Sequence, residues 1–337
     1  MIKQAISVLV NGDSLNPDEA AQAMSEIMDG EATPAQISAF VTALRIKGET
    51  LDEILSMARV MREKSLRVEV DDRVIDTCGT GGDSSGTFNI STTVGLVVAG
   101  AGVKVAKHGN RAASGATGSA DVLEELGVKI DLGPEGVKFC IDEIGFGFMF
   151  AQIFHPAMRF AALPRREIGI RTIFNTLGPL MNPANASAQV FGMADPSLAD
   201  TVAQFLDRRG TTHALIVHGH DGLDEISLSG ATDVWELENG DVSAYTIGPE
   251  DFGLESIDNS SLKVDSITAS ASMVKDVLEG NHGPARDMVL VNSAAALVAA
   301  GDASMLKEGV SIAAKSIDEG VAKDKLDSLI ELSHRVG

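Results

Sequence analysis

The sequence predicts an α/β protein in which a small N-terminal helical domain precedes a larger domain with a mostly parallel central sheet covered by helices. Three observations carry this prediction. Residues 1–65 show only helical patterns with clear starts and stops. From Asp71 onward, strand-like and helix-like segments alternate, which favours a parallel sheet flanked by helices. The chain has 337 residues and is 44% hydrophobic, which suffices for a large core or for two domains.

The N-terminal helices begin at capping signals and end at glycines. Asn16-Pro17-Asp18-Glu19, Thr33-Pro34-Ala35-Gln36 and Thr50-Leu51-Asp52-Glu53 each place a capping side chain before a helix, two of them with proline at the first helical position. Gly30 and Gly48 end the first two of these helices. Residues 1–70 are therefore expected to form a helical domain without chemistry of its own.

Residues 71–337 are expected to form the α/β domain. Residues 74–77 are predicted as a strand, and a helix is predicted from Ser91 to about Ala99. Asn239-Gly240 between two alternating segments is a strong hairpin signal. The further strands expected are Val103–Val105, Gly147–Phe150, Ala214–His218, Val234–Leu237 and Val242–Ile247.

Composition limits the classes of function. There are 27 Lys and Arg against 48 Asp and Glu, a net charge of −21, which argues against a nucleic-acid binder. The longest uncharged apolar run, Val94–Val103, is far shorter than the ~20 residues of a membrane span. The N-terminus lacks a secretory pattern, and Cys78 and Cys140 fit reduced thiols. We expect a cytoplasmic protein that binds neither nucleic acid nor membrane.

A glycine-rich loop follows the first predicted strand, and a helix start follows the loop. The loop is Gly79-Thr80-Gly81-Gly82-Asp83, and the helix start is Asn89-Ile90-Ser91-Thr92. Glycines let backbone N–H groups point at an anion, and hydroxyls add donors where the helix dipole favours negative charge. Asp83 would repel a bare phosphate, so it suits a sugar hydroxyl or a phosphate approached through a metal. A tight turn with an ordinary N-cap explains the same residues equally well.

Two further segments carry cations. Lys107-His108-Gly109-Asn110-Arg111 follows the strand expected at 103–106 and could bind an anion, with His108 as an orienting donor or a base. A solvated basic turn is the alternative. Arg165 and Arg166 follow His155 by about ten residues, and a bidentate arginine is a natural reader of a carboxylate. A surface pair between an arginine and Glu167 is the alternative.

The segment 218–225 follows a predicted strand and is rich in histidine and acid. Adjacent Asp224 and Glu225 suit Mg²⁺, which binds through one or two carboxylates plus substrate phosphate. If this stretch continued as a strand, alternation would separate the two carboxylates. His218 and His220 with Asp224 would instead suggest a transition metal, and solvated loop acids are a third interpretation.

In this order and spacing, the motifs closely resemble those of the anthranilate phosphoribosyltransferases of tryptophan biosynthesis. The matching segments are residues 76–83, 88–92, 107–111, 171–180, 221–225 and 283–287. The family usually has a serine where Gly115 stands, while Ser114 and Ser119 remain in place.

The resemblance implies that the amine of anthranilate is joined to C1 of 5-phosphoribosyl 1-diphosphate (PRPP) with release of pyrophosphate. It implies a helical domain hinged to the α/β domain, with a contribution from about 170–185, a homodimer formed largely through the helical domains, and two Mg²⁺ ions. No single catalytic acid or base is expected. The implied PRPP-binding residues are Gly79, Gly82, Asp83, Thr87, Asn89, Ser91, Thr92, Lys107 and Ser119. Those implied for anthranilate are Gly79, His108, Asn110, His155, Arg165 and Pro179, and those for the metal are Ser91, Asp224 and Glu225.

Two rival functions remain at this stage. A pyrimidine-nucleoside phosphorylase resembles this family in fold and also attacks ribose C1, but that family carries a Lys-His-Ser-Thr-Gly-Gly loop and an additional C-terminal domain. A non-catalytic paralogue that binds nucleic acid is opposed by the net charge and by the presence of Arg165, Asp224 and Glu225.

Overall fold

The computed structural model describes residues 1–112 and 117–337. They separate into two compact units, one of residues 1–67 and 151–183 and one of residues 68–150 and 184–337. The first unit is helical, and the second is built on a sheet whose first five strands are parallel. The fold class predicted from the sequence is therefore confirmed.

The first unit contains the four N-terminal helices and a later helical segment. Asn16, Thr33 and Thr50 each accept a hydrogen bond from the backbone N–H three residues on, and the residue at that position bonds back, as the capping signals predicted. Its elements are α1 (Ile2–Val10), α2 (Pro17–Met28), α3 (Pro34–Lys47), α4 (Leu51–Glu63), α8 (Ala151–Phe154), η1 (Pro156–Met158), α9 (Arg159–Ile168) and α10 (Ile173–Leu180).

The later segment of this unit is longer than the sequence indicated. It begins at residue 151, whereas a contribution was expected only from about 170. The backbone N–H of Leu66 donates to the carbonyl oxygen of Phe154 at 2.9 Å. Phe160 packs its ring so closely over Gly30 that an added Cβ there would lie 2.6 Å from the ring. Such contacts join residues far apart in the chain, so local patterns do not reveal them.

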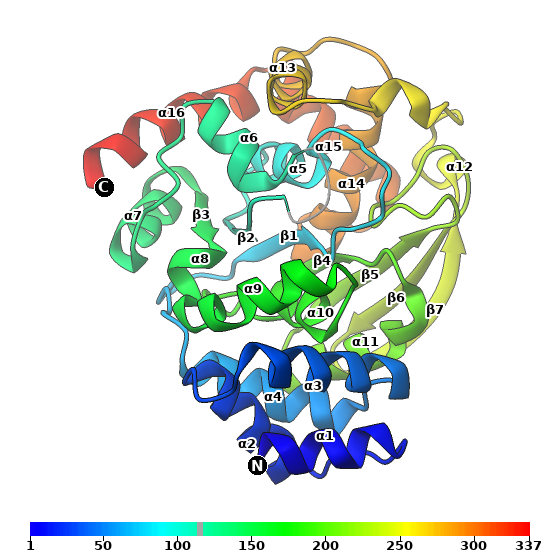
Figure 1. Ribbon diagram of the computed structural model, residues 1–337. Helices are drawn as coiled ribbons and strands as arrows, with labels where there is room; N and C mark the ends of the chain where they lie inside the picture. Colours follow the sequence, from blue (N-terminus) through cyan, green and yellow to red (C-terminus); the bar gives the residue numbers. More distant parts are fainter. Residues whose placement is uncertain (113–116) are drawn as a thin grey trace. The chain divides into compact units, whose positions relative to one another are not determined.

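The second unit contains a seven-stranded sheet in the order β3-β2-β1-β4-β5-β6-β7 (Figure 1). The strands from β3 to β5 in this order pair in parallel, and β5, β6 and β7 pair antiparallel. The strands are β1 (Ile75–Gly79), β2 (Val105–Gly109), β3 (Phe146–Phe150), β4 (Ala188–Gly192), β5 (His213–Gly219), β6 (Thr232–Glu238) and β7 (Asp241–Ile247).

Helices α5 and α14 pack next to the parallel strands and form the centre of the core. Both are apolar almost all round, as expected of helices buried on several sides. The helical elements of this unit are α5 (Ile90–Gly100), α6 (Ser119–Glu125), α7 (Pro134–Ile144), η2 (Pro196–Leu198), α11 (Ala199–Arg209), α12 (Pro249–Phe252), η3 (Asn259–Leu262), α13 (Ile267–Leu278), α14 (Pro284–Ala300), α15 (Leu306–Asp318) and α16 (Val321–Val336).

The predicted hairpin is confirmed. Asn239 and Gly240 have φ of +51° and +91°, the left-handed values of the tight turn that joins β6 to β7. The limits of β1 and β2 differ from the prediction. Strand β1 extends to Gly79, and β2 begins at Val105 and ends at Gly109, because both pair in register with neighbouring parallel strands. Lys107 and His108 therefore lie on a strand and not in a turn after it.

None of the helices in residues 1–112 and 117–337 combines the length and hydrophobicity needed to span a membrane.

Candidate active site

The carboxyl ends of the parallel strands in the second unit meet at one edge of the sheet. Strands β1, β2, β4 and β5 end there at Gly79, Gly109, Gly192 and Gly219. The strand order reverses between β1 and β4, since the chain adds β2 and β3 on one side and β4 and β5 on the other. Ligands of open α/β sheets bind in the crevice at such a switch point. We call this region the switch-point edge.

Glycines at the switch-point edge bring Asp224 against the ends of β1 and β4. A Cβ on Gly79 would lie 3.0 Å from Cγ of Asp224, and one on Gly192 would lie 2.6 Å from the carbonyl carbon of Asp224. Gly81 and Gly82 have φ of +62° and +72°, which glycine adopts without strain. The N–H of Gly81 donates to Oδ2 of Asp224 at 2.7 Å. The loop is thus a tight turn whose N–H already binds a negatively charged oxygen.

The rest of this loop is tied to the segment before α13. Thr87 forms an isolated antiparallel bridge with Lys263, and the N–H of Phe88 donates to the carbonyl oxygen of Leu262 at 2.9 Å. Oδ1 of Asp83 accepts the N–H of Ser85 at 3.2 Å. The loop that carries Gly82, Asp83 and Thr87 therefore has a defined path between β1 and α5.

The start of α5 offers donors and unsatisfied polar atoms. The backbone N–H of Ser91 donates to the carboxylate of Glu225. The side-chain oxygens of Asn89 and Thr92 are buried, and neither has a hydrogen-bond partner among the residues described. Buried polar atoms are rarely left unpaired, so these two oxygens mark a place where a polar ligand fits.

Lys107 is the buried cation of the switch-point edge. Its residue is 1% exposed, and its ammonium donates to the carbonyl oxygen of Thr77 and, at 3.2 Å, to Oγ of Ser91. Burial lowers the pKa of Lys107, while Asp76 and Glu225 oppose that change by favouring its charged form. The interpretation of Lys107 as part of a solvated basic turn is therefore wrong.

Asp224 and Glu225 lie in the connection between β5 and β6 and not on a strand, so strand alternation does not separate them. Burial and the neighbouring Asp224 raise the pKa of Glu225 well above its usual value, and Lys107 opposes this. Asp83 is close enough to raise it further. The described residues form no cluster of three or more metal-ligating side chains. Mg²⁺ does not need such a cluster, because it takes few protein ligands and keeps waters or substrate oxygens. The two adjacent carboxylates of Asp224 and Glu225 therefore fit Mg²⁺.

The two histidines nearby do not face this pair. Nδ1 of His218 bonds to the carbonyl oxygen of Met193 at 2.7 Å, and Nε2 of His220 pairs with Asp233 at 3.0 Å. These bonds speak against the transition-metal interpretation. Asp221 is also structural, because its carboxylate accepts from Ser227, Ser229, Asn259 and the N–H of Leu223.

The end of β2 places the remaining residues of this edge. The N–H of His108 donates to Oδ1 of buried Asp76 at 3.2 Å. Oγ of Ser119 donates to the carbonyl oxygen of exposed Asn110 at 3.3 Å, so these two residues are neighbours. Arg111 pairs with Asp121 at 2.9 Å and Glu124 at 2.8 Å. The positive charge of Arg111 is therefore paired with two carboxylates of the same chain, whereas its segment was expected to be able to bind an anion. Ser114 and Gly115 lie outside the described residues.

His155, Arg165 and Pro179 belong to the first unit. Burial lowers the pKa of His155 to about 4, although a hydrogen bond with the backbone of Met181 opposes this, so its imidazole is neutral at pH 7. The guanidinium of Arg165 lies 5.5 Å from the ring centre of Phe174, and burial lowers its pKa. Glu167 forms no ion pair with Arg165 or Arg166 in the part of the chain that is described, so the surface-pair interpretation is not supported.

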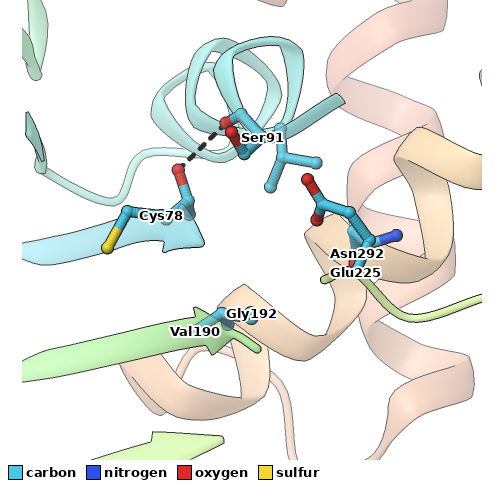
Figure 2. Close-up of a pocket in the computed structure, with 8 residues that line it drawn as sticks. Cys78, Ser91, Val190, Gly192, Glu225 and Asn292 are labelled. Atoms are coloured by element: carbon cyan, nitrogen blue, oxygen red, sulfur yellow. Dashed lines mark hydrogen bonds between the residues drawn. The ribbon is translucent and has the colours of Figure 1, made fainter. Parts of the chain in front are cut away.

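A small pocket at the switch-point edge contains residues that the sequence did not single out. Ser91, Glu225, Cys78 and Asn292 are among the residues that line it (Figure 2). The thiol of Cys78 accepts a hydrogen bond from Gln189 at 3.1 Å, and burial raises its pKa, so it stays protonated. Asn292 lies within the Ala-rich segment 289–300, which contains none of the motifs singled out in the sequence. A lone amide in such a segment is the signal that could have identified it.

Known proteins match this chain along nearly its whole length. The model of the glycosyl transferase family a/b domain matches residues 71–323, and that of the helical bundle domain matches residues 3–65. An anthranilate phosphoribosyltransferase of Dehalococcoides mccartyi is 52% identical over 335 residues, 99% of this chain and 98% of the relative. One of Moorella thermoacetica is 53% identical over 331 residues, with 98% of each chain covered.

Solved structures agree with these relatives. The anthranilate phosphoribosyltransferase of Thermus thermophilus superposes with a TM-score of 0.91 at 41% identity, covering 98% of this chain and 99% of that one. The enzyme of Saccharomyces cerevisiae in complex with PRPP and Mg superposes with a TM-score of 0.92 at 28% identity, covering 99% and 98%. By both family models and by these full-length relatives, the chain belongs to the glycosyl transferase family and, within it, to the anthranilate phosphoribosyltransferases.

Proposed function

We propose that this chain transfers the phosphoribosyl group of PRPP to the amine of anthranilate, and that the switch-point edge is where PRPP binds. The observation that carries the proposal is the junction of three features: the glycine loop after β1, the polar start of α5, and Lys107 beside the Asp224–Glu225 pair. Relatives of the same length carry this activity in their names, and one neighbour was solved with PRPP and Mg.

The chemistry requires little acid–base catalysis from the protein. The amine nitrogen of anthranilate forms a bond to C1 of the ribose as the bond from C1 to the diphosphate oxygen breaks. Pyrophosphate leaves with the electron pair, and the amine loses one proton. Negative charge develops on the leaving diphosphate and positive charge on the ribose ring, so positioning and fixed charges contribute most of the rate.

Each proposed PRPP residue has a role that follows from its chemistry. The backbone N–H groups of Gly79 and Gly82 and the polar groups of Thr87, Asn89, Ser91, Thr92 and Ser119 would bind phosphate and diphosphate oxygens. The ammonium of Lys107 would stabilise negative charge that develops on leaving. Asp83 would accept from a ribose hydroxyl or face a metal-bound phosphate. Gly81, which donates to Asp224, belongs to the same loop.

Asp224, Glu225 and Ser91 would hold Mg²⁺, and we propose two ions, one for each carboxylate. When bound, Mg²⁺ neutralises diphosphate oxygens and so stabilises the leaving group. The raised pKa of Glu225 supports this assignment, because burial beside Asp224 leaves negative charge that a cation would offset.

The residues proposed for anthranilate are Gly79, His108 and Asn110 in the second unit and His155, Arg165 and Pro179 in the first unit. We propose that Arg165 binds the anthranilate carboxylate. Burial disfavours its charged guanidinium, so a negatively charged partner would stabilise it. Neutral His155 can donate or accept one hydrogen bond without adding charge.

We also propose a homodimer built through the helical unit and a cytoplasmic location. Val10 and Ile46, at the ends of the contacting helices α1 and α3, are 66% and 81% exposed, which supports an interface on this unit. The free thiols of Cys78 and Cys140 suit a reducing compartment.

The test is the loss of anthranilate fluorescence in the presence of purified protein, PRPP and Mg²⁺. Consumption is expected only when both PRPP and Mg²⁺ are present, and EDTA is expected to stop it. Pyrimidine nucleoside with inorganic phosphate is the comparison substrate pair. Activity on that pair without consumption of anthranilate would overturn the proposal in favour of a nucleoside phosphorylase.

A further inference from the structure

Asn292, on helix α14, uses its side-chain amide to hold one backbone position far away in the sequence. Its Oδ1 accepts the N–H of Ile226 at 2.9 Å, and its Nδ2 donates to the carbonyl oxygens of Ile226 and Met288, each at 3.0 Å. The side chain is buried, with 2% of the residue exposed. Both amide hydrogens and the amide oxygen are therefore engaged, and two of the three bonds go to a single residue.

That residue directly follows Glu225. The segment from Asp221 to Ile226 has no strand pairing of its own, so its path depends on bonds from elsewhere. Oδ1 of Asp221 accepts the N–H of Leu223 at 3.2 Å and fixes the segment before Asp224. Asn292 fixes it after Glu225. The two carboxylates thus lie between two anchor points.

Asn292 also lies at the site itself. It lines the same pocket as Ser91 and Glu225, and Figure 2 shows its side chain beside that of Glu225. Helix α14 packs against α5, β1, β4 and β5, so it is held by the core of the unit. A side chain on this helix can transmit the rigidity of the core to the connection that carries the carboxylates.

We propose that Asn292 is a positioning residue for the Asp224–Glu225 pair, and that its hydrogen bonds to Ile226 hold both carboxylates where they bind the metal. The proposal rests on the proposed function of the pair as the Mg²⁺ site. Groups that orient metal ligands from behind typically change metal affinity 10- to 100-fold when they are removed. Asn292 touches no substrate in this proposal, so it is not a catalytic residue.

The experiment is the substitution Asn292→Ala, with metal binding measured directly. Mn²⁺ replaces Mg²⁺, and the free ion is counted by electron paramagnetic resonance with and without PRPP. We expect the dissociation constant for Mn²⁺ in the presence of PRPP to rise roughly 10- to 100-fold. We also expect faster hydrogen–deuterium exchange in the peptide that contains Ile226, and a raised Mg²⁺ requirement with a smaller change in the KM for anthranilate.

Two control variants on the same helix separate positioning from general damage. Ser293→Ala removes a buried hydroxyl that has no hydrogen-bond partner among the described residues, so wild-type Mn²⁺ binding is expected. Leu297→Ala removes buried methyl groups and is expected to lower the melting temperature without removing a hydrogen bond to Ile226, so its Mn²⁺ affinity is expected to stay near wild type.

The outcomes distinguish this inference from the proposed function. If the wild-type chain binds Mn²⁺ with PRPP and Asn292→Ala binds it equally well, the positioning role is refuted. The same conclusion follows if Leu297→Ala weakens Mn²⁺ binding as much as Asn292→Ala does. If the wild-type chain itself binds no Mn²⁺ with PRPP, the proposed metal site is wrong. Should Asn292→Ala fail to fold, Asn292→Ser, whose hydroxyl is too short to reach both groups of Ile226, is measured against the same expectation.

Discussion

Substitution of Gly192 by alanine tests whether close backbone approach at the switch-point edge sets the position of Asp224. The added Cβ would lie 2.6 Å from the carbonyl carbon of Asp224 and closer still to its oxygen. Ordinary contact begins at 3.4 Å, so the carbonyl carbon alone requires the two backbones to separate by 3.4 − 2.6 = 0.8 Å, and the nearer oxygen requires more. Both partners are backbone atoms, so no side-chain rotation relieves the clash.

This displacement has two measurable consequences. Overpacking of this kind costs about 1–3 kcal/mol of stability, seen as a lower melting temperature. A shift of about 1 Å in a positioned group costs on the order of 100-fold in rate, so kcat/KM in the anthranilate fluorescence assay is expected to fall by that factor. The metal requirement is expected to rise with it, because Asp224 carries one of the proposed ligands.

Gly230→Ala is the matched control for this prediction. Gly230 lies in the same connection between β5 and β6, no atom lies within 4 Å of the position of an added Cβ, and its φ is not in the left-handed range. Near wild-type activity and stability are expected. If Gly192→Ala retained activity within threefold of Gly230→Ala, tight contact between β4 and Asp224 would not matter for the reaction, and the reasoning from the glycines would be refuted.

Two predictions concern the first unit. Folding lowers the pKa of His155 from 6.5 to about 4, so between these pH values the unfolded chain binds more protons than the folded chain. The contribution of neutral His155 to the free energy of unfolding is therefore complete above pH 6.5 and is lost as the pH falls towards 4. At pH 5 the free energy of unfolding is expected to be about 2 kcal/mol lower than at pH 7.5 because of this group. Chemical denaturation of His155→Gln is expected to lack that part of the pH dependence. If the free energy of unfolding changed equally with pH in both proteins, the burial argument would be contradicted. Arg165→Ala is expected to raise the KM for anthranilate roughly 10- to 100-fold, since a hydrogen bond to a charged group contributes about 1.5–3 kcal/mol, while exposed Arg166→Ala serves as the control. An unchanged KM in Arg165→Ala would remove it from the carboxylate-binding role.

Local sequence signals determined most of the secondary structure, because each acts within a few residues. The capping residues Asn16, Thr33 and Thr50 were sufficient to locate three helices, and Asn239-Gly240 located the hairpin. The end of β2 was misjudged because pairing with β3 continues through Lys107 to Gly109, and such pairing is not local. The extent of the helical unit was underestimated for the same reason, since Phe160 and Gly30 meet only in three dimensions.

The candidate site was predictable where its residues form motifs and unpredictable where a single residue acts at a distance. The glycine loop, Lys107 and the Asp224–Glu225 pair stand in recognisable segments, and the structure brings them to one edge of the sheet. Asn292 reaches Ile226 across 66 residues and has no surrounding motif. Arg111 shows the opposite case, because it stands within a basic motif that could bind an anion, whereas Asp121 and Glu124 pair with it in the structure.

The charges at the switch-point edge explain why an acidic chain can bind a substrate that carries several phosphates. Asp83 and Asp224 lie near Glu225, and Lys107 lies near Glu225 and Asp76, so the carboxylates outnumber the one buried cation before any ligand arrives. Burial raises the pKa of Glu225 and lowers that of Lys107, so burial disfavours the charged form of each group, and the opposite charge of the other favours it. PRPP adds further negative charge, which Lys107 alone cannot offset. Divalent cations held by these carboxylates would reduce this repulsion, and we therefore expect PRPP and metal ions to bind together, with neither binding tightly without the other.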